Sequence, residues 1–478
     1  MQEKFYNLIE DQGNVPDEYL QSIGEIKRVL ERWTIDDGFR QNKSIEEGLI
    51  SINSSVTIEE IFPFIDKAEA IELRKKENRN EDHCYPQSVR QYRHFIKEKM
   101  GGRQGIRKNI EPDNPKFRSW RKRQINRCIG ELGPIKAEGL VHAPVAFELS
   151  KGCSVGCWFC AVSSHKLESV WKYNTENKEL WREGLIVLKK IIGECIKYGV
   201  CYWATEPFDC PDYENFIEDF THITGRCPQT TTAVPDRNIE RTRKFLKLTE
   251  QLKGGINRFS INSLDTLNTI HENFSARDLT YIELIPLNLE ASSQYKKANA
   301  GRARLVKNNS DDEILKANVQ DEDNASTIAC ISGFIINMVD KSIELITPCP
   351  ASNKWPTGYW VLCKEHFTDA HELSTIIQSM IDKHMTSELP LTQVIKFRKD
   401  LNWTNDPDEK TIEIASKYLL IKFKRLVFTE EMFKLISEEK HFAYQIALTL
   451  EKQYNVDLSL IMLQMTELYE KGLFDEEP

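Results

Sequence analysis

Apolar residues recur at helical spacing near the start of the chain. In the run 15–33 they stand three or four positions apart, with charged residues between them, which is typical of a helix with one buried face. The runs that begin at Ser44 and Thr57 both read hydroxyl-Ile-Glu-Glu, and such a hydroxyl can cap a helix while the second Glu returns the hydrogen bond. The first 80 residues or so are therefore predicted to be helical.

From about residue 140 the pattern changes to short apolar runs that alternate with helical segments. This alternation predicts β-α units with parallel strands. A return strand is expected at 341–347, directly after the sixth strand. The six strands are predicted at 143–149, 200–205, 229–234, 256–262, 281–287 and 327–337.

Beyond about residue 385 strand-like runs within 411–428 precede three helical segments. The chain is therefore predicted to hold an N-terminal helical region (1–138), an α/β domain (139–384) and a small C-terminal α+β domain (385–478). The last of these resembles winged-helix peptide-recognition domains found with peptide-modifying enzymes. A plain helical cap is the alternative interpretation.

Composition narrows the class of protein. Hydrophobic residues make up 40% and charged residues 29% of the 478 residues, as in soluble globular proteins. No apolar run is long enough to span a bilayer, and the N-terminus lacks a signal-peptide pattern. Twelve Cys without a secretion signal favour a reducing compartment and metal chemistry. We expect a cytoplasmic enzyme with no membrane partner.

A basic stretch with interleaved aromatic residues runs from Tyr92 to Arg127. Such a pattern can bind nucleic acid, but the formal charge of −9 for the whole chain disfavours nucleic acid as the main partner. A solvated basic helix face is the favoured interpretation. A surface that accepts an acidic peptide is a further alternative.

The candidate chemistry lies in the triplet Cys153, Cys157 and Cys160, a C-x₃-C-x₂-C pattern directly after the first predicted strand. Three thiolates can hold three irons of a four-iron cluster. Electron-carrier clusters are held by four Cys, so a missing fourth ligand leaves one iron open for chemistry. The other nine Cys form no second set of this kind, which predicts a single cluster. The alternative is three unrelated Cys packed as small apolar residues.

This triplet resembles the radical S-adenosylmethionine superfamily. The resemblance implies a partial (β/α)₆ barrel, one 4Fe-4S cluster, S-adenosyl-L-methionine on the open iron, and a flavodoxin- or ferredoxin-type reductant. In such barrels the chemistry collects at the C-terminal ends of the strands.

Four residues are expected to bind the cofactor. Ala204-Thr205-Glu206-Pro207 stands where the superfamily carries Gly-Gly-Glu, so Glu206 is assigned to the methionyl ammonium, although both glycines are replaced. Ser260 and Asn262 alternate onto one face of the fourth strand and are assigned to the ribose or carboxylate. Trp158, directly after the second Cys of the triplet, is also assigned to the cofactor.

A finer resemblance covers roughly residues 140–365. The runs 142–160, 228–233, 257–260, 346–352 and 355–359 resemble the radical peptide epimerases that mature proteusin-type ribosomal peptides. This implies conversion of L- to D-residues in a precursor peptide with a leader sequence, by removal of the α-hydrogen and hydrogen return from a Cys thiol.

Cys349, which has Pro on both sides, is the expected hydrogen donor, and Cys330 is the second candidate. A buried structural Cys is the alternative for both. For the whole chain, a radical maturase that methylates carbon or forms crosslinks is the alternative reaction. A non-catalytic iron–sulfur protein is the alternative outside catalysis.

Overall fold

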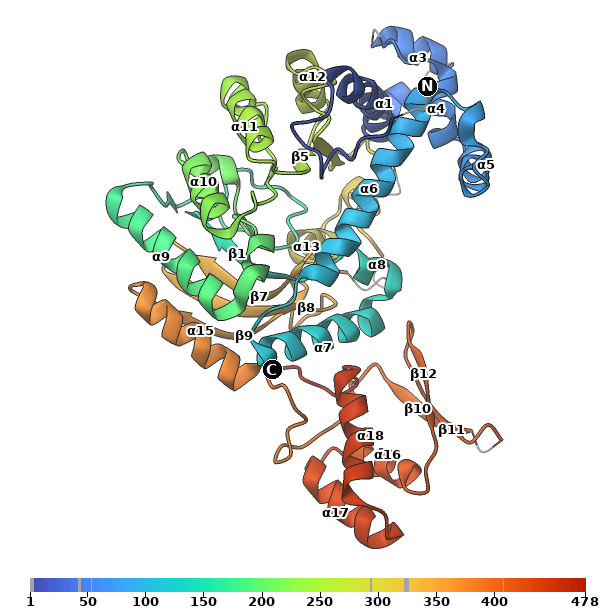
Figure 1. Cartoon of the computed structure of the whole chain (residues 1–478), viewed down its shortest axis with the longest axis vertical. Coiled ribbons are helices and arrows are strands. Elements are labelled where there is room, and N and C mark those ends of the chain that lie inside the picture. The colour runs from blue at the N-terminus through green and yellow to red at the C-terminus, as the bar shows by residue number, and fades with distance from the viewer. Residues whose placement is uncertain (1–3, 42–43, 53, 293–294, 322–325, 407) are drawn as a thin grey trace.

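The computed structural model describes residues 4–41, 44–52, 54–292, 295–321, 326–406 and 408–478. Figure 1 shows the N-terminal helices at the upper right, a mixed α/β body in the centre and left, and a C-terminal unit below. The α/β class is confirmed. Among the described residues, no helix combines the length and apolar character needed to cross a membrane.

The N-terminal region is helical, as predicted. Ser44 caps its helix by accepting a hydrogen bond from the backbone N–H of Glu47 (3.1 Å), and the backbone N–H of Thr57 donates to Glu60 (2.8 Å). Both predicted helix starts are therefore confirmed. The helices of this region are α1 (Asp17–Ile35), α2 (Asp37–Arg40), α3 (Ile45–Ser51), α4 (Ile58–Ile65), α5 (Lys67–Asn78), α6 (Gln87–Asn109), α7 (Pro115–Leu132) and α8 (Pro134–Glu138).

The basic stretch differs from the prediction of a solvated face where it forms α7. Arg121, Arg123 and Arg127 are buried there. Arg121 donates to the backbone carbonyls of His142 (2.8 Å) and Ile110 (2.7 Å). A buried guanidinium must satisfy its donors inside the protein, so these arginines join segments together and present no free cationic surface.

The larger sheet has the order β1-β7-β8-β9. β1 and β7 are parallel, whereas β7, β8 and β9 form an antiparallel meander. The predicted return strand is confirmed as β8, and β9 was not predicted. The bounds are β1 (Ala143–Glu148), β7 (Ile331–Asn337), β8 (Ser342–Pro348) and β9 (Tyr359–His366).

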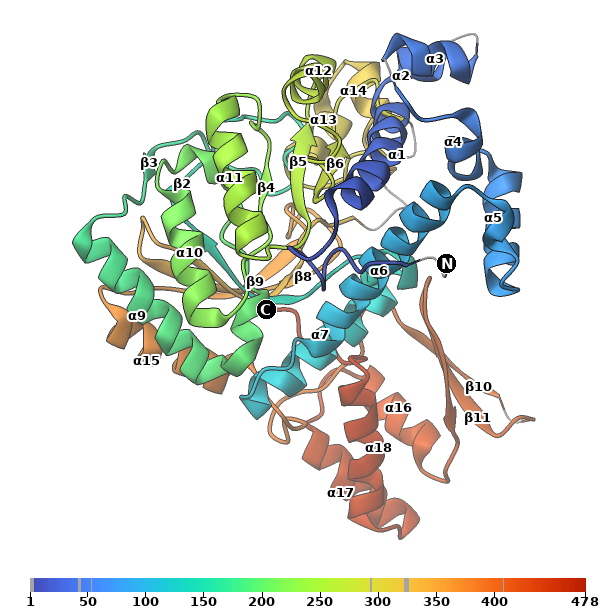
Figure 2. The same ribbon diagram turned by 45° about the horizontal axis from the view of Figure 1, so that its top comes forward.

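A second, parallel sheet has the order β4-β5-β6. Its strands are β4 (Thr231–Thr232), β5 (Asn257–Ile261) and β6 (Ile282–Pro286). The predicted second strand is reduced to one parallel bridge between Val200 and Ala146 of β1. The intervening helices, which run from the left side (α9) to the top (α12) of Figure 2, are α9 (Thr175–Ile192), α10 (Tyr213–Thr224), α11 (Ile239–Gln251) and α12 (Leu264–Asn273).

The predicted β-α alternation is therefore present, but the sixth predicted strand, β7, pairs with β1 and not with β6. Strand pairing within the described residues gives separate sheets and no continuous barrel wall. The partial (β/α)₆ barrel stays a prediction. The remaining helices of this part are α13 (Gly301–Asn309), α14 (Glu313–Ala317) and α15 (Ala370–His384), with single 3₁₀ turns at 193–198 and 207–209.

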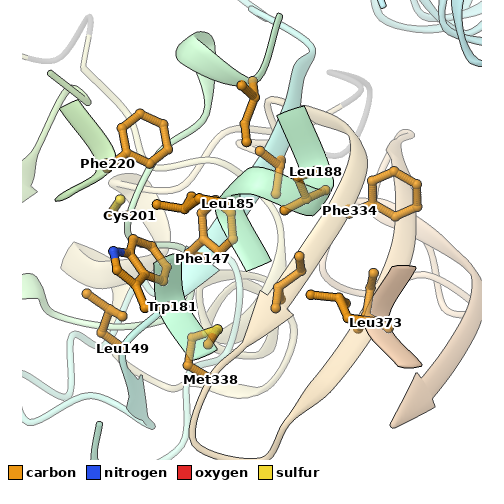
Figure 3. Packing of buried hydrophobic residues seen from close by; sticks show 14 of the residues in the cluster. Phe147, Leu149, Trp181, Leu185, Leu188, Cys201, Phe220, Phe334, Met338 and Leu373 are labelled. Carbon is orange, nitrogen blue, oxygen red and sulfur yellow. The ribbon is translucent and has the colours of Figure 1, made fainter. Parts of the chain in front are cut away.

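The two faces of the β1-β7 pair carry different contacts because side chains alternate along a strand. Phe147 and Phe334 point into the main core, against Trp181 and Leu185 of α9 and Leu373 of α15 (Figure 3). The other face carries smaller apolar side chains, and it packs against the segment around Val200. These side chains are Ala143, Ala146, Ile331, Ile335 and Ile346.

The C-terminal unit has three antiparallel strands followed by three helices, as predicted. Residues from Leu389 to Phe474 supply its own apolar core. The strands exclude a plain helical cap, and the winged-helix assignment stays a prediction. The elements are β10 (Asn402–Asp406), β11 (Thr411–Ala415), β12 (Leu420–Lys424), α16 (Thr429–Ser437), α17 (Ala443–Tyr454) and α18 (Leu458–Glu470).

Candidate metal centre

The three cysteines of the triplet lie on one loop that begins just after β1. A short strand, β2 (Ser150–Lys151), pairs with β3 (Ser169–Val170) and closes the base of this loop. The backbone N–H of Cys153 donates to the carbonyl of His165 (2.9 Å). Gly152 adopts φ +83°, and a Cβ there would lie 2.3 Å from the carbonyl oxygen of Lys166. Only glycine allows the loop to approach its return segment this closely.

A second contact fixes the loop from the other side. Asp209 accepts hydrogen bonds from the backbone N–H (2.8 Å) and the hydroxyl (2.5 Å) of Ser154, and Arg237 binds both residues. The Asp209 side chain is 1% exposed and that of Arg237 is 49% exposed. Sequence analysis did not find this anchor, because no spacing pattern links residues 154, 209 and 237.

Backbone amides point at the thiols. The N–H of Ser164 donates to the Sγ of Cys160 (3.4 Å). Burial raises the pKa of the Cys153 thiol, and hydrogen bonds from the N–H groups of Val155 and Gly156 oppose that rise. Burial, with the neighbouring thiols, raises the pKa of Cys157 to about 11. Amides directed at sulfur favour the thiolate form and are the kind of contact that tunes iron–sulfur clusters.

The spacing of the thiols distinguishes a cluster from a single ion. A tetrahedral zinc at about 2.3 Å from each thiolate requires sulfur–sulfur separations of about 3.8 Å. Among the described residues, the Sγ atoms of Cys153, Cys157 and Cys160 do not all lie within 4.8 Å of one another. Three cysteine thiolates on one loop are the ligand type that iron–sulfur clusters use, so the donor set suits the 4Fe-4S group that the sequence predicts.

Glu206 lies in the same neighbourhood and is 3% exposed. Its carboxylate accepts hydrogen bonds from the hydroxyl of Thr232 (2.6 Å) and from the N–H groups of Ala233 (2.8 Å) and Phe208 (3.0 Å). Burial raises the pKa of Glu206, and these three hydrogen bonds oppose the rise. A carboxylate has about four acceptor positions, so one is left for a ligand cation.

Ser260 lies on the fourth predicted strand, β5, and Asn262 directly follows it. Phe259 and Ile261, which alternate with them along the chain, belong to a separate apolar core. The Oδ1 atom of Asn262 is buried and has no hydrogen-bond partner within the described residues. A buried acceptor of this kind normally has a partner, which suits contact with a bound group. Trp158 is partly buried and makes an edge-to-face contact with Phe159 (5.4 Å between ring centres).

The structure brings the two candidate donor thiols to one edge of the larger sheet. Cys330 immediately precedes β7, and its carbonyl accepts from the N–H of Ala143 (2.8 Å). Because β8 runs antiparallel to β7, Cys349 at its end lies at the same edge. The triplet follows the opposite end of β1, and a strand of this length spans about 17 Å. Cys330 and Cys349 therefore both lie at the end of the sheet opposite to the cysteine loop, and the assignment of either as hydrogen donor stays a prediction.

The two thiols also face different surroundings. Cys349 is 2% exposed, and the charged groups that act on it are Arg127 and Glu131 of α7. Burial raises the pKa of both thiols, so both are protonated at neutral pH.

Cys330 lies on the face with smaller side chains, where it packs beside Val200, Trp203 and Tyr359. The charged group that acts on its pKa is Arg258 of β5, which opposes the rise caused by burial. Cys330 therefore faces the space between the two sheets, whereas Cys349 faces α7.

A cavity adjoins the cysteine loop on the same face as Cys330. Trp203 and Tyr359 meet edge-to-face there (5.8 Å between ring centres), and the indole N–H of Trp203 is buried without a partner among the described residues. Glu148 lies at its base. Further lining comes from β7, β8 and β9 and from residues 162–165. No local sequence pattern predicted this cavity, because its wall is assembled from five separate segments.

Comparison with known proteins gives one close relative. No protein-family model matches the chain. A solved structure of BtrN in complex with AdoMet and 2-DOIA aligns over 42% of this chain and 71% of that chain at 13% identity, with a TM-score of 0.30, which is too low to establish a common fold. The uncharacterized protein y4wI of Sinorhizobium fredii is 36% identical over 399 residues, which cover 81% of this chain and 75% of that protein. The chain therefore belongs to the same protein family as y4wI.

Proposed function

We propose that the chain is a radical S-adenosylmethionine enzyme that carries one 4Fe-4S cluster on Cys153, Cys157 and Cys160. The observation that carries the proposal is the thiol triplet itself, held on a two-sided anchored loop with backbone amides aimed at its sulfurs. When bound, the cluster and its cofactor supply a 5′-deoxyadenosyl radical that removes a hydrogen atom from the substrate.

The protein's own groups would orient the cofactor. Glu206 keeps one acceptor position free for the methionyl ammonium, and a charge-assisted hydrogen bond there is stronger than a neutral one. The unpartnered Oδ1 of Asn262 and the hydroxyl of Ser260 supply polar contacts on β5 for the ribose or carboxylate. Trp158 supplies an aromatic wall next to the second thiolate.

The substrate that we propose is a ribosomally made precursor peptide, and the reaction is epimerisation of its residues. The α-hydrogen leaves as an atom, and a Cys thiol returns a hydrogen atom to the opposite face. The thiol becomes a thiyl radical in this step and needs one electron and one proton to be restored. A flavodoxin- or ferredoxin-type protein is the proposed source of electrons for both the cofactor and the thiol.

Two arguments point to different thiols as the hydrogen donor. The family resemblance assigns it to Cys349. The contacts favour Cys330, since this thiol faces the space between the two sheets, whereas Cys349 faces α7. We therefore propose Cys330 as the donor, with Cys349 as the alternative.

The C-terminal unit is proposed to bind the leader part of the precursor. β12 is an edge strand of its sheet within the described residues, and an edge strand can pair with an extended peptide. Leu420 on β12 and Val427 just after it are 62% and 71% exposed. Exposed apolar side chains beside an edge strand suit a peptide with alternating apolar residues.

Co-expression with a precursor peptide from a neighbouring gene, in deuterated water, tests the proposal. Each converted residue should gain one mass unit, and hydrolysis should give the matching D-amino acid. The variant with Cys153, Cys157 and Cys160 all replaced by Ala is the control and should give unlabelled L-peptide. A mass increase that corresponds to a methyl group would identify the reaction as methylation, and a net loss of hydrogen would identify it as crosslinking. Either result would contradict epimerisation.

A further inference from the structure

The first residues of α13 contact the cysteine loop directly. The backbone N–H of Arg302 donates to the carbonyl of Cys160 (2.9 Å), and that of Gly301 donates to the carbonyl of Pro356 (2.7 Å). Gly301 adopts φ +54°, and a Cβ there would lie 2.2 Å from the carbonyl oxygen of Ala161. Glycine at this position lets the helix start touch the loop, so the side chain of Arg302 projects from a fixed point beside the thiols.

The guanidinium of Arg302 has no carboxylate partner in the described part of the chain. Its Nε is buried and lacks a hydrogen bond. The other arginines around the site differ: Arg237 pairs with Asp209, Arg241 with Glu214, and Arg258 with Glu283. Arg302 instead acts electrostatically on the thiol of Cys157.

An unpaired, partly buried cation is costly, because it loses water without gaining a counter-charge. Native proteins seldom leave one in place without a use for it. The arrangement around Arg302 therefore suits an anion that a ligand brings to this spot. Two sources fit this chemistry, namely the thiolate-bound cluster and the carboxylate of the cofactor.

We propose that Arg302 is the counter-charge of the cluster and stabilises its reduced state. This inference rests on the proposed function. Three thiolates give the site a negative charge, and one-electron reduction adds another. A fixed cation next to Cys157 favours the more negative state, so it raises the reduction potential of the cluster.

The test uses the full-length protein, reconstituted with iron and sulfide in the absence of oxygen. Its cluster is titrated over a range of redox potentials, and electron paramagnetic resonance measures the reduced fraction at each potential. Arg302→Gln should shift the ratio of reduced to oxidised cluster at least tenfold towards oxidised at a fixed potential, which is about 59 mV for one electron. Arg302→Lys keeps the charge and should retain most of the wild-type potential. Arg304→Gln is the matched control, because Arg304 lies on the same helix and binds Asn353 (3.2 Å); its potential should not change.

An unchanged potential in Arg302→Gln, with a full iron content, would overturn the inference. So would a weaker affinity for S-adenosylmethionine with an unchanged potential, since that result would assign the guanidinium to the carboxylate. Loss of iron in Arg302→Gln but not in Arg302→Lys would support the role of the positive charge at the cluster. Loss of iron in both variants would contradict the inference, because it would show that the shape of the guanidinium, and not its charge, is needed. A wild-type protein that takes up no cluster would overturn the proposed function itself.

Discussion

Asp209 accepts two hydrogen bonds from Ser154, the residue that follows the first cysteine of the triplet. The carboxylate is almost completely buried, whereas its ion-pair partner Arg237 is half-exposed. Asp209 lies 55 residues further along the chain than Ser154, so this contact joins the cysteine loop to the turn that follows Glu206. The metal loop and the proposed cofactor ligand are therefore positioned by one side chain.

Replacing Asp209 by Ala should weaken cluster assembly. Ser154 is exposed, so water can replace the lost acceptor, and the loss of the two hydrogen bonds costs about 0.5–1.5 kcal/mol each. The loop would also lose the contact that fixes its conformation. Iron and sulfide content after reconstitution should fall well below the wild-type value, while the far-ultraviolet circular dichroism stays native. Arg237→Gln is the comparison, with a smaller effect because a half-exposed ion pair contributes about 0–1 kcal/mol. Wild-type iron content in Asp209→Ala would refute the anchoring role.

Glu206 should make the binding of S-adenosylmethionine depend on pH. The ionised carboxylate attracts the ammonium, and burial raises the pKa of Glu206 above that of an exposed Glu. Affinity should therefore decline as the pH falls through this raised pKa. The effect on folding has the opposite direction: the folded chain holds this proton more tightly, so the contribution of Glu206 to the free energy of unfolding decreases as the pH rises from the ordinary Glu value through the raised one.

Glu206→Gln should bind the cofactor roughly 10- to 100-fold more weakly at neutral pH, in line with the loss of a charge-assisted hydrogen bond of about 1.5–3 kcal/mol. It should also lose the pH dependence. Anaerobic calorimetric titration at mildly acidic and neutral pH measures both. Glu214→Gln, on α10 and paired with Arg241, is the control and should bind normally. Equal affinity of Glu206→Gln and wild type at every pH would remove Glu206 from the cofactor site.

Variants of the two candidate donor thiols, Cys330 and Cys349, should differ in their ability to form D-residues. Cys330→Ala should still cleave S-adenosylmethionine into 5′-deoxyadenosine but should form no D-residues, because the substrate radical then lacks its hydrogen donor. Cys349→Ala should retain D-residue formation, since that thiol faces α7. Chiral amino-acid analysis of the precursor after hydrolysis measures the difference. The reverse pattern would assign the role to Cys349, as the family resemblance suggests.

Arg127 should contribute strongly to stability. Its guanidinium binds Glu131 (2.5 Å) and the carbonyl of Pro348 (2.5 Å), and it lies over the ring of Trp360 (3.7 Å). Arg127→Met leaves the buried Glu131 carboxylate short of its main partner, which costs about 3–5 kcal/mol for a broken buried pair. The thermal unfolding midpoint should fall accordingly.

The double variant Arg127→Met, Glu131→Leu should recover most of this loss, because it removes the unpaired charge as well. Thermal unfolding of the wild type and both variants gives the comparison. A double variant that is as unstable as Arg127→Met would show that packing against Trp360, and not the buried charge, sets the stability here.

Local patterns in the sequence predicted the parts of the molecule that depend on local physics. The caps at Ser44 and Thr57 involve residues three positions apart, and the cysteine triplet lies within eight residues. Alternation along β5 predicted that Ser260 and Asn262 share a side. In each case the interacting groups are close in the chain, so spacing alone constrains their geometry.

Other parts depend on which strands become neighbours. The flanking prolines of Cys349 indicate a stiff backbone, but they do not show where the thiol lies; the antiparallel direction of β8 brings Cys349 to the same end of the sheet as Cys330. The arginines of α7 look solvated in sequence because their partners are distant: Arg123 pairs with Glu476, 353 residues away. Such contacts follow from tertiary packing, which no local pattern encodes.

Electron paramagnetic resonance of the reconstituted, reduced protein, recorded with and without S-adenosylmethionine, tests whether the triplet holds a cluster with an open iron. We predict a 4Fe-4S signal that changes when the cofactor is added, because three protein thiolates leave one iron open to bind it. A signal that is identical in both samples, or no cluster signal at all, would contradict the assignment of Cys153, Cys157 and Cys160 to a catalytic cluster.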